Sequence, residues 1–367
     1  MTPRRGLPAP RVWLKAAGAL ALAMLLGACE RPDAVQHGYR GLNTAQLYKP
    51  GKIAAAAELH SIPAAEEPAD PDSPSVNEVF KNVQVLNDIS ATEFSRLMQA
   101  LSTWVAPEEG CDFCHNPEKL ESDEKYTKVV ARRMLQMTRK INTDWKAHVG
   151  ETGVTCWTCH RGQAVPSGDW FASPTSDALH TLSNPSGQNK PSRVAVGSSL
   201  PDDSLSTYLV HDADIRVQGT TAMAGQNLHS VKQTEWTYSL MLYMANSLGV
   251  NCTYCHSSRA FASWKESTPQ RATAWHGIRM VRNLNTDYLI PLKSTFPENR
   301  LSAEGDGPKV GCATCHKGAL KPLYGVSSLK DYQVLSGVQP PAEAASAAAP
   351  AASAAPLKVA ATSGTKP

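Results

Sequence analysis

The chain has 367 residues, of which 36 are Lys or Arg and 33 are Asp or Glu, and its formal net charge is +3 at pH 7. Four of the basic side chains, and no acidic one, lie within residues 1–28. The remainder has 32 basic against 33 acidic side chains, a formal balance of −1, which excludes nucleic acid as a main partner.

The N-terminal segment is typical of an export signal. An apolar run from Ala16 to Ala28 follows the basic residues and is too short to span a bilayer. It ends in Leu26-Gly27-Ala28-Cys29, which resembles the box of bacterial lipoproteins, whose cysteine receives a diacylglycerol. We therefore predict a signal peptide over residues 1–28 and a lipid at Cys29 that anchors the protein to the periplasmic face of the inner membrane. The alternative is an ordinary signal peptide, which leaves Cys29 as a free thiol.

An arm and two helices are predicted next. Residues 29–75 contain six prolines and an alanine run, which indicates an extended arm, with plain disorder as the alternative. Ser90-Ala91-Thr92-Glu93 matches a capping box, and apolar residues, among them Met98, recur at helical spacing until Pro107 ends the helix. A second helix is predicted from about Asp123 to Asn142.

The pattern Cys-x-x-Cys-His occurs four times and uses eight of the nine cysteines. Two thiols at this spacing can each form a thioether to a haem vinyl group, while the adjacent histidine offers its imidazole to the iron. Zinc knuckles or disulfides would not require a histidine after every second cysteine. The sequence therefore predicts four covalently bound c-type haems. The attachment residues are Cys111, Cys114, Cys156, Cys159, Cys252, Cys255, Cys312 and Cys315, followed by His115, His160, His256 and His316.

The second half of the chain repeats the plan of the first. Thr92-Glu93-Phe94 with Leu97-Met98 is echoed by Thr234-Glu235-Trp236 with Leu240-Met241, each shortly before a Cys-x-x-Cys-His. An Asn-Thr-Asp segment precedes the second motif of each half. The predicted fold is mainly α, with long irregular loops and few short strands: a multihaem cytochrome built from an internally duplicated two-haem unit, in segments 76–168 and 226–325.

The two halves differ at one candidate ligand. Aligning the Asn-Thr-Asp segments places Met137 opposite Met280 but Met134 opposite Gly277. If Met134 serves the second haem, the fourth haem needs another donor, for which His148 is a candidate. Alternatively, Met137 and Met280 serve both haems and His148 is a surface or structural histidine. Taken singly, a methionine on a helix is more often a core residue than a ligand.

Two further segments lack clear periodicity. Residues 169–225 are rich in Ser, Asn, Gly, Pro and Asp and are predicted to be a surface connection of strand or loop. Residues 326–367 are rich in Ala and Pro and are predicted to be disordered, because they bury too little apolar surface. Met223 and Met244 are interpreted as packing residues.

In these features the sequence resembles the tetrahaem cytochrome c subunit of purple bacterial photosynthetic reaction centres. The resemblance covers about residues 26–325 and rests on the lipoprotein box, the paired motifs and the spacing of the candidate ligands from them. It implies His/Met ligation for three haems and two histidines for one, the second arriving from the other half. By this resemblance the ligand pairs are Met98 with His115, Met134 with His160, Met241 with His256, and His148 with His316.

The resemblance also implies a function. With six ligands on every iron there is no open position for a substrate, so the chain is an electron carrier and not an enzyme. It accepts electrons from a soluble cytochrome c or high-potential iron–sulfur protein, contacts the reaction centre L and M subunits, and re-reduces the photo-oxidised bacteriochlorophyll special pair. The haem at Cys252 lies nearest the pigment, followed by those at Cys312, Cys156 and Cys111. The alternative, a periplasmic multihaem reductase or quinol-oxidising cytochrome, would need an open or lysine-ligated iron or a membrane-spanning quinone site.

Acidic residues are dense around the first motif. A cluster of one sign steers a basic partner such as a soluble cytochrome, although charge runs are also common on solvated loops. The cluster is therefore a candidate docking surface for the donor. Its members are Glu108, Glu109, Asp112, Glu118 and Glu121, with Asp123 and Glu124 beside them.

Overall fold

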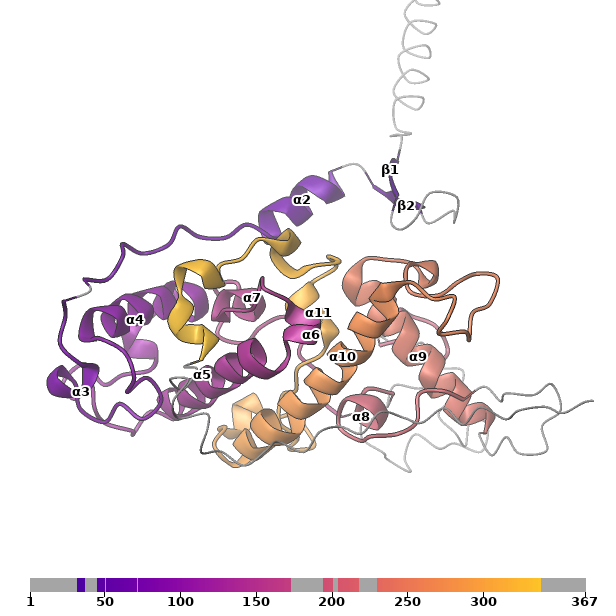
Figure 1. Ribbon diagram of the computed structural model, residues 1–367. Coiled ribbons are helices and arrows are strands. Elements are labelled where there is room, and N and C mark those ends of the chain that lie inside the picture. Colours follow the sequence, from indigo (N-terminus) through magenta and orange to yellow (C-terminus); the bar gives the residue numbers. More distant parts are fainter. Residues whose placement is uncertain are drawn as a thin grey trace, which may run out of the picture.

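The computed structural model describes residues 32–36, 45–49, 51–70, 72–172, 194–200, 204–217 and 230–337. The signal segment, Cys29, Met223 and the tail beyond residue 337 lie outside this part. The described part is mainly helical with few short strands, as the sequence predicts (Figure 1). No helix in these ranges is both long and apolar enough to cross a bilayer.

The secondary structure consists of helices joined by short turns. The α-helices are α2 (Lys52–Leu59), α3 (Val76–Val79), α4 (Ala91–Val105), α5 (Tyr126–Asp144), α6 (Lys146–Val149), α7 (Cys156–His160), α8 (Ser204–Leu209), α9 (Val231–Leu248), α10 (Pro269–Leu284) and α11 (Cys312–His316). The 3-10 turns are η1 (Gly110–Phe113), η3 (Cys252–Tyr254), η5 (Ile290–Ser294), η6 (Glu298–Arg300), η7 (Pro322–Gly325), η8 (Leu329–Asp331) and η9 (Gln333–Ser336), while η4 (Asn285–Leu289) is π-helical. Strands β1 (Asp33–Gln36) and β2 (Ala45–Tyr48) form an antiparallel hairpin.

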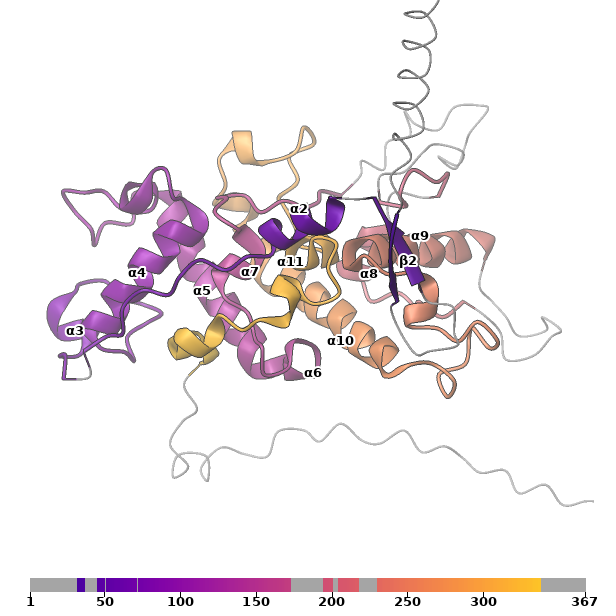
Figure 2. The same ribbon diagram turned by 90° about the horizontal axis from the view of Figure 1, so that it is seen from above.

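The helices are arranged along an elongated body. In both views α3 and α4 lie at one end, α7 and α11 in the middle, and α9 with one end of α10 toward the other end (Figures 1 and 2). Helices α7 and α11 contact each other, and α6 contacts α10. Elements of the two halves of the sequence therefore meet in the middle of the molecule.

Helix α4 begins where the sequence predicts. The Ser90 side chain accepts a hydrogen bond from the Glu93 backbone N–H at 3.2 Å. The predicted capping box is only half formed, because the Glu93 carboxylate pairs with Arg96 at 3.1 Å instead. Helix α5 begins at Tyr126 rather than near Asp123, because the Asp123 carboxylate is bound by Arg132 at 2.8 Å.

The predicted surface connection is wrong for residues 204–209. This segment is helix α8, and Leu205, Tyr208 and Leu209 are buried in the same apolar core as α5, α9 and α10. Residues 169–225 are polar in composition overall, but they include this helix of about one and a half turns, whose apolar side chains share one face. A short helix of this kind leaves almost no periodic signal.

The boundary of the predicted tail is also wrong. Residues 326–337 are described and carry η8 and η9, with Leu329, Tyr332 and Leu335 buried against α4 and α5. Leu329 lies on η8, Leu335 on η9 and Tyr332 at the bend between the two turns, and all three side chains pack into the same core. The chain therefore closes the core of the first half with residues from beyond the second.

The N-terminal arm crosses both halves of the molecule. The hairpin lies beside the end of α9, where the Tyr48 hydroxyl donates to the Gly249 carbonyl at 3.1 Å. Helix α2 then passes over α7 and α11, and residues 61–70 run along α4 (Figures 1 and 2). The arm thus connects the end that carries Cys252 to the end that carries Cys111.

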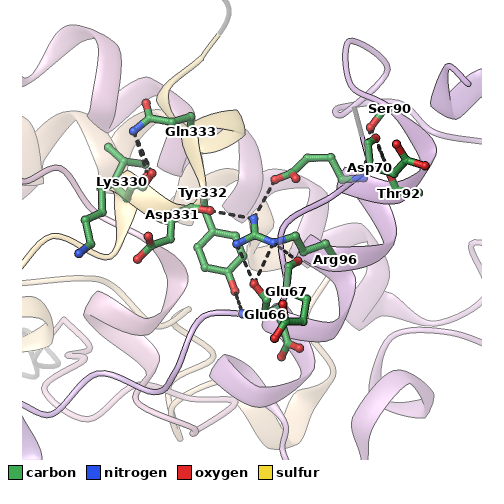
Figure 3. Close-up of polar contacts among 12 residues, drawn as sticks. Glu66, Glu67, Asp70, Ser90, Thr92, Arg96, Lys330, Asp331, Tyr332 and Gln333 are labelled. Atoms are coloured by element: carbon green, nitrogen blue, oxygen red, sulfur yellow. Dashed lines mark hydrogen bonds and ion pairs between the residues drawn. The ribbon is translucent and has the colours of Figure 1, made fainter. Parts of the chain in front are cut away.

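Arg96 on α4 fastens the arm and the C-terminal segment together (Figure 3). Its guanidinium donates to the backbone carbonyls of Glu66, Glu67 and Asp331. It also stacks over the Tyr332 ring at 4.2 Å, and the Tyr332 hydroxyl accepts from the Glu66 N–H at 3.0 Å. Two segments far apart in the sequence are thereby held on the helix that carries Met98.

Candidate functional site

The four Cys-x-x-Cys-His segments fold into two kinds of turn. Those beginning at Cys111 and Cys252 lie on the 3-10 turns η1 and η3, and those beginning at Cys156 and Cys312 form the short helices α7 and α11. All eight motif cysteines are free thiols, so the disulfide alternative finds no pairing among them. The first motifs of the two halves therefore share one local structure, a 3-10 turn, and the second motifs share another, a short α-helix.

Each motif histidine is oriented by a carbonyl a few residues downstream. The Nδ1 atoms of His115 and His256 donate to the Leu120 and Phe261 carbonyls, both at 2.9 Å. Those of His160 and His316 donate to the Gln163 and Ala319 carbonyls at 2.8 and 3.0 Å. A histidine that donates from Nδ1 keeps the lone pair of Nε2 for a metal, which is the usual second-sphere arrangement of histidine ligands.

Burial favours the neutral form of three of the motif imidazoles. It is the largest cause that lowers the pKa of His160 and His256, and burial followed by the neighbouring His148 lowers the pKa of His316 to about 4. Only a neutral imidazole can bind a metal ion. The three rings are therefore in the ligand form at neutral pH.

His148 faces His316 across the middle of the molecule. It lies on α6, in the first half, and the two ring centroids are 6.0 Å apart with the planes inclined at 63°. With metal–nitrogen bonds of about 2 Å, two opposed imidazoles have centroids roughly 6 Å apart. His148 donates from Nδ1 to the Thr273 carbonyl at 2.9 Å, so its Nε2 also keeps its lone pair.

Gly277 makes room for this histidine. A Cβ atom at Gly277, on α10, would lie 2.5 Å from Cε1 and 3.2 Å from Nε2 of His148. The His148 ring therefore occupies the space that a side chain at position 277 would need. A methionine at position 277, opposite Met134, would therefore overlap the His148 ring.

The methionines divide into two groups. Met98, Met134 and Met241 lie on α4, α5 and α9 and are partly buried at the edges of the apolar cores. Met137 and Met280 are 8% and 7% exposed and belong to the central core itself. Met137 and Met280 therefore contribute to the packing of this core. Met244 lies at the edge of the core, as Met134 and Met241 do.

Several buried polar groups near the motifs lack a protein partner, which tests whether the residues fit haem. His60 is 3% exposed and neither ring nitrogen makes a hydrogen bond, and the indole nitrogens of Trp145 and Trp236 are also unpartnered. Arg161 and Lys317, directly after His160 and His316, form no ion pair with any described carboxylate. Both cations donate to neutral oxygens instead, Arg161 to the Leu59 and Cys315 carbonyls and Lys317 to Ser167. A flat apolar cofactor with carboxylate side chains fits these neutral groups and the two cations without a carboxylate partner.

The asparagine of each Asn-Thr-Asp segment is a functional residue that sequence reasoning missed. Asn142 exchanges two hydrogen bonds with the backbone of Val154, at 2.9 and 2.8 Å, and Asn285 does the same with Val310, at 3.0 and 2.9 Å. Val154 and Val310 each stand two residues before the first cysteine of a motif. The repetition of Asn-Thr-Asp in both halves was the available signal.

The two central motifs meet. Helices α7 and α11 lie side by side, and a hydrogen bond with Cys315, together with burial, raises the pKa of the Cys159 thiol. The Arg161 guanidinium donates to the Leu59 carbonyl of the arm and, at 3.5 Å, to the Cys315 carbonyl. The motifs at Cys156 and Cys312 are therefore neighbours, whereas those at Cys111 and Cys252 lie toward opposite ends.

The acidic cluster near Cys111 is largely exposed. The exposed members are Glu108, Glu109, Asp112, Glu118 and Glu121. Two neighbouring acids are bound within the loop: Asp123 pairs with Arg132, and Glu124 accepts from Asn116 and Ser122. The hydrogen bond from Arg132 holds the pKa of Asp123 below its usual range.

Comparison with known proteins identifies the family of the chain. A family model described as photosynthetic reaction centre cytochrome C subunit matches residues 29–336. The photosynthetic reaction center cytochrome c subunit of Rubrivivax gelatinosus is 49% identical over 335 residues, which cover 90% of each chain. The subunit of Thermochromatium tepidum is 46% identical over 355 residues, which cover 95% of this chain and 86% of the relative. The subunit of Roseobacter denitrificans is 45% identical over 279 residues, which cover 72% of this chain and 74% of the relative. The chain therefore belongs to the photosynthetic reaction centre cytochrome c subunits, electron carriers with covalently bound c-type haem.

Proposed function

We propose that this chain is a four-haem subunit that accepts electrons from a soluble periplasmic donor and re-reduces the photo-oxidised bacteriochlorophyll special pair of the reaction centre. The observation that carries the proposal is the His148–His316 pair, because two imidazoles at 6.0 Å with both Nε2 atoms free suit a six-coordinate iron and exclude substrate from it. When bound, haem supplies reversible one-electron chemistry.

The chain would hold each haem through thioethers from the two cysteines of a motif and through two side chains that bind the iron. We assign the pairs His115 with Met98, His160 with Met134, His256 with Met241, and His316 with His148. The downstream carbonyls fix the four motif imidazoles, and the partly buried methionines stand at the edges of the cores rather than within them. With two side chains available for each iron, the sites would leave no open position for a substrate, as suits an electron carrier.

The paired motifs arise from internal duplication of a two-haem unit. Support comes from contacts that recur at matching positions. Asn142 and Asn285 each bind the backbone just before a motif. Three residues before each asparagine, an arginine pairs with an aspartate: Arg139 with Asp88, and Arg282 with Asp212. Thr127 and Thr268 each donate to the carbonyl of the residue before the second cysteine of a first motif. Such agreement between halves follows naturally from a shared ancestor.

The end that carries Cys252 faces the membrane and the L and M subunits. Asp33, where β1 begins, is four residues from Cys29, a separation of at most about 14 Å along the chain. The hairpin is bound to Gly249, immediately before the motif at Cys252. A lipid on Cys29 would therefore lie near this end, which also exposes Phe261 and Trp264, each 48% accessible. The acidic end at Cys111 would then face the periplasm and the donor.

Flash-induced oxidation of the haems in isolated membranes tests the proposal. A haem absorbance bleach that follows the flash, and recovers on adding a reduced soluble cytochrome, is expected. Turnover of a reducible substrate without any reaction centre, together with no flash response, would instead favour a reductase. Mass spectrometry of the mature N-terminus tests the anchor, since an unmodified terminus at Cys29 would exclude it.

A further inference from the structure

Lys128 is a lysine whose ammonium group is buried beside the first motif. It lies on α5 and is 8% exposed, and its Nζ donates to the carbonyls of Leu120 and Ser122 at 2.7 and 2.8 Å. The Asp123 carboxylate lies 3.4 Å away. Because an ammonium group is costly to remove from water, the loop of residues 120–123 is shaped to supply its partners.

The Leu120 carbonyl has a second donor. It also accepts from Nδ1 of His115 at 2.9 Å, so one oxygen serves both the motif histidine and a buried cation. In the described part of the chain, no side-chain cation donates to the carbonyls that orient the other three motif histidines. Arg271, which the alignment of the Asn-Thr-Asp segments places opposite Lys128, donates to the Ala262 and Ser263 carbonyls and not to Phe261. The shared acceptor is therefore particular to the first motif.

Sharing the Leu120 carbonyl changes how strongly the His115 imidazole donates electrons to a metal. A carbonyl that accepts from Nδ1–H makes an imidazole a stronger electron donor to its metal, which stabilises the oxidised form. An ammonium group on the same oxygen draws on its lone pairs with a charge-assisted bond and weakens that effect. The positive charge itself disfavours oxidation further. Both contributions raise the midpoint potential of the iron bound by His115.

We propose that Lys128 is a positioning residue that raises the midpoint potential of the haem at Cys111 by sharing the Leu120 carbonyl with His115. The inference rests on the proposed haem at Cys111. The midpoint potential of the haem at the donor end would then depend on a residue that is not one of its iron ligands. The other His/Met sites lack this determinant.

Redox titration of the purified holoprotein, with the four haems resolved by their spectra, tests this role. Lys128→Met should lower one midpoint, that of the haem at Cys111, and leave three unchanged. Lys128→Arg keeps a cation and should stay close to the parent. Lys125→Met is the matched control, because Lys125, the residue just before α5, carries the same charge but donates to the Asp112 carbonyl, and its variant should shift that midpoint less.

An unchanged midpoint in Lys128→Met would overturn the inference, as would an equal shift in Lys125→Met, which would make charge alone the cause. If the Met variant does not accumulate with its haems, Lys128→Gln, which keeps a neutral donor without the charge, should show a smaller downward shift of the same midpoint, and an unchanged midpoint in that variant would overturn the inference as well. The haem count of the parent protein separates this result from the proposed function: fewer than four haems contradicts the proposed function, whatever Lys128 does.

Discussion

The imidazole of His148 lies against Gly277, 2.5 Å from the position that a Cβ atom there would take. The contact joins a short helix of the first half to a long helix of the second. It places the ring opposite His316, with its Nδ1 held by the carbonyl of Thr273 on the same long helix. Helix α10 therefore positions His148 both by the space at residue 277 and by a hydrogen bond one turn earlier.

Gly277→Ala should displace His148. The new Cβ overlaps the ring, so the variant is expected to lose about 1–3 kcal/mol of stability and to alter the spectrum of one haem, that held by His316. Gly307→Ala is the control, because its Cβ would come no closer than 3.6 Å to Lys293. Electron paramagnetic resonance of the oxidised proteins is the measurement. A spectrum of Gly277→Ala that matches the parent would show that the ring does not need this space.

His148→Met should keep four haems attached and raise one midpoint potential. Imidazole donates more strongly to ferric iron than a thioether does, so its replacement favours the reduced form. Redox titration resolves the shift, and His276→Met, next to Gly277 on α10, serves as the control and should change nothing. Four unaltered midpoints in His148→Met would exclude His148 as a ligand.

Local features of this molecule could be predicted from the sequence, whereas contacts between distant segments could not. The cap at Ser90 and the motifs at Cys111 and Cys252 depend on residues within a few positions of one another. By contrast, Asn142 binds the Leu335 carbonyl, 193 residues away, and Arg96 binds that of Asp331, 235 residues away. No periodicity encodes such partners, which is why the order of residues 326–337 was missed. The position of His148 could be anticipated because the duplication supplied a comparison: a glycine where the other half has Met134.

Asn142→Ala should lower the free energy of unfolding by about 3 kcal/mol, because it removes three buried hydrogen bonds to Val154 and Leu335 and leaves backbone groups unpaired. Denaturant unfolding of the holoprotein measures the loss. Asn246→Ala, at an exposed position of α9, should stay within about 0.5 kcal/mol of the parent. Equal stability of the two variants would mean that the hydrogen bonds of Asn142 do not stabilise the segment before Cys156.

Arg96→Lys should release the arm while keeping the charge. A lysine cannot donate to three carbonyls from one plane or stack on Tyr332 as a guanidinium does. Hydrogen exchange of residues 61–70 and 327–336 is expected to speed up in the variant, while that of α10 stays the same. Unchanged protection of both segments would show that the apolar contacts of Tyr332 and Leu335 hold them without Arg96.

The acidic surface near Cys111 should guide a basic donor. Glu108→Gln with Glu121→Gln removes two exposed charges and should lower the second-order rate of reduction by a basic soluble cytochrome roughly two- to fivefold at low salt. The effect should fade as added salt shortens the range of the field to less than about 10 Å. Glu58→Gln with Glu151→Gln, a pair exposed on other segments, removes the same charge and should change the rate far less. Stopped-flow kinetics decides between them: equal rates for the two double variants would assign the effect to net charge, and no effect from either would place the docking site elsewhere or make the contact apolar.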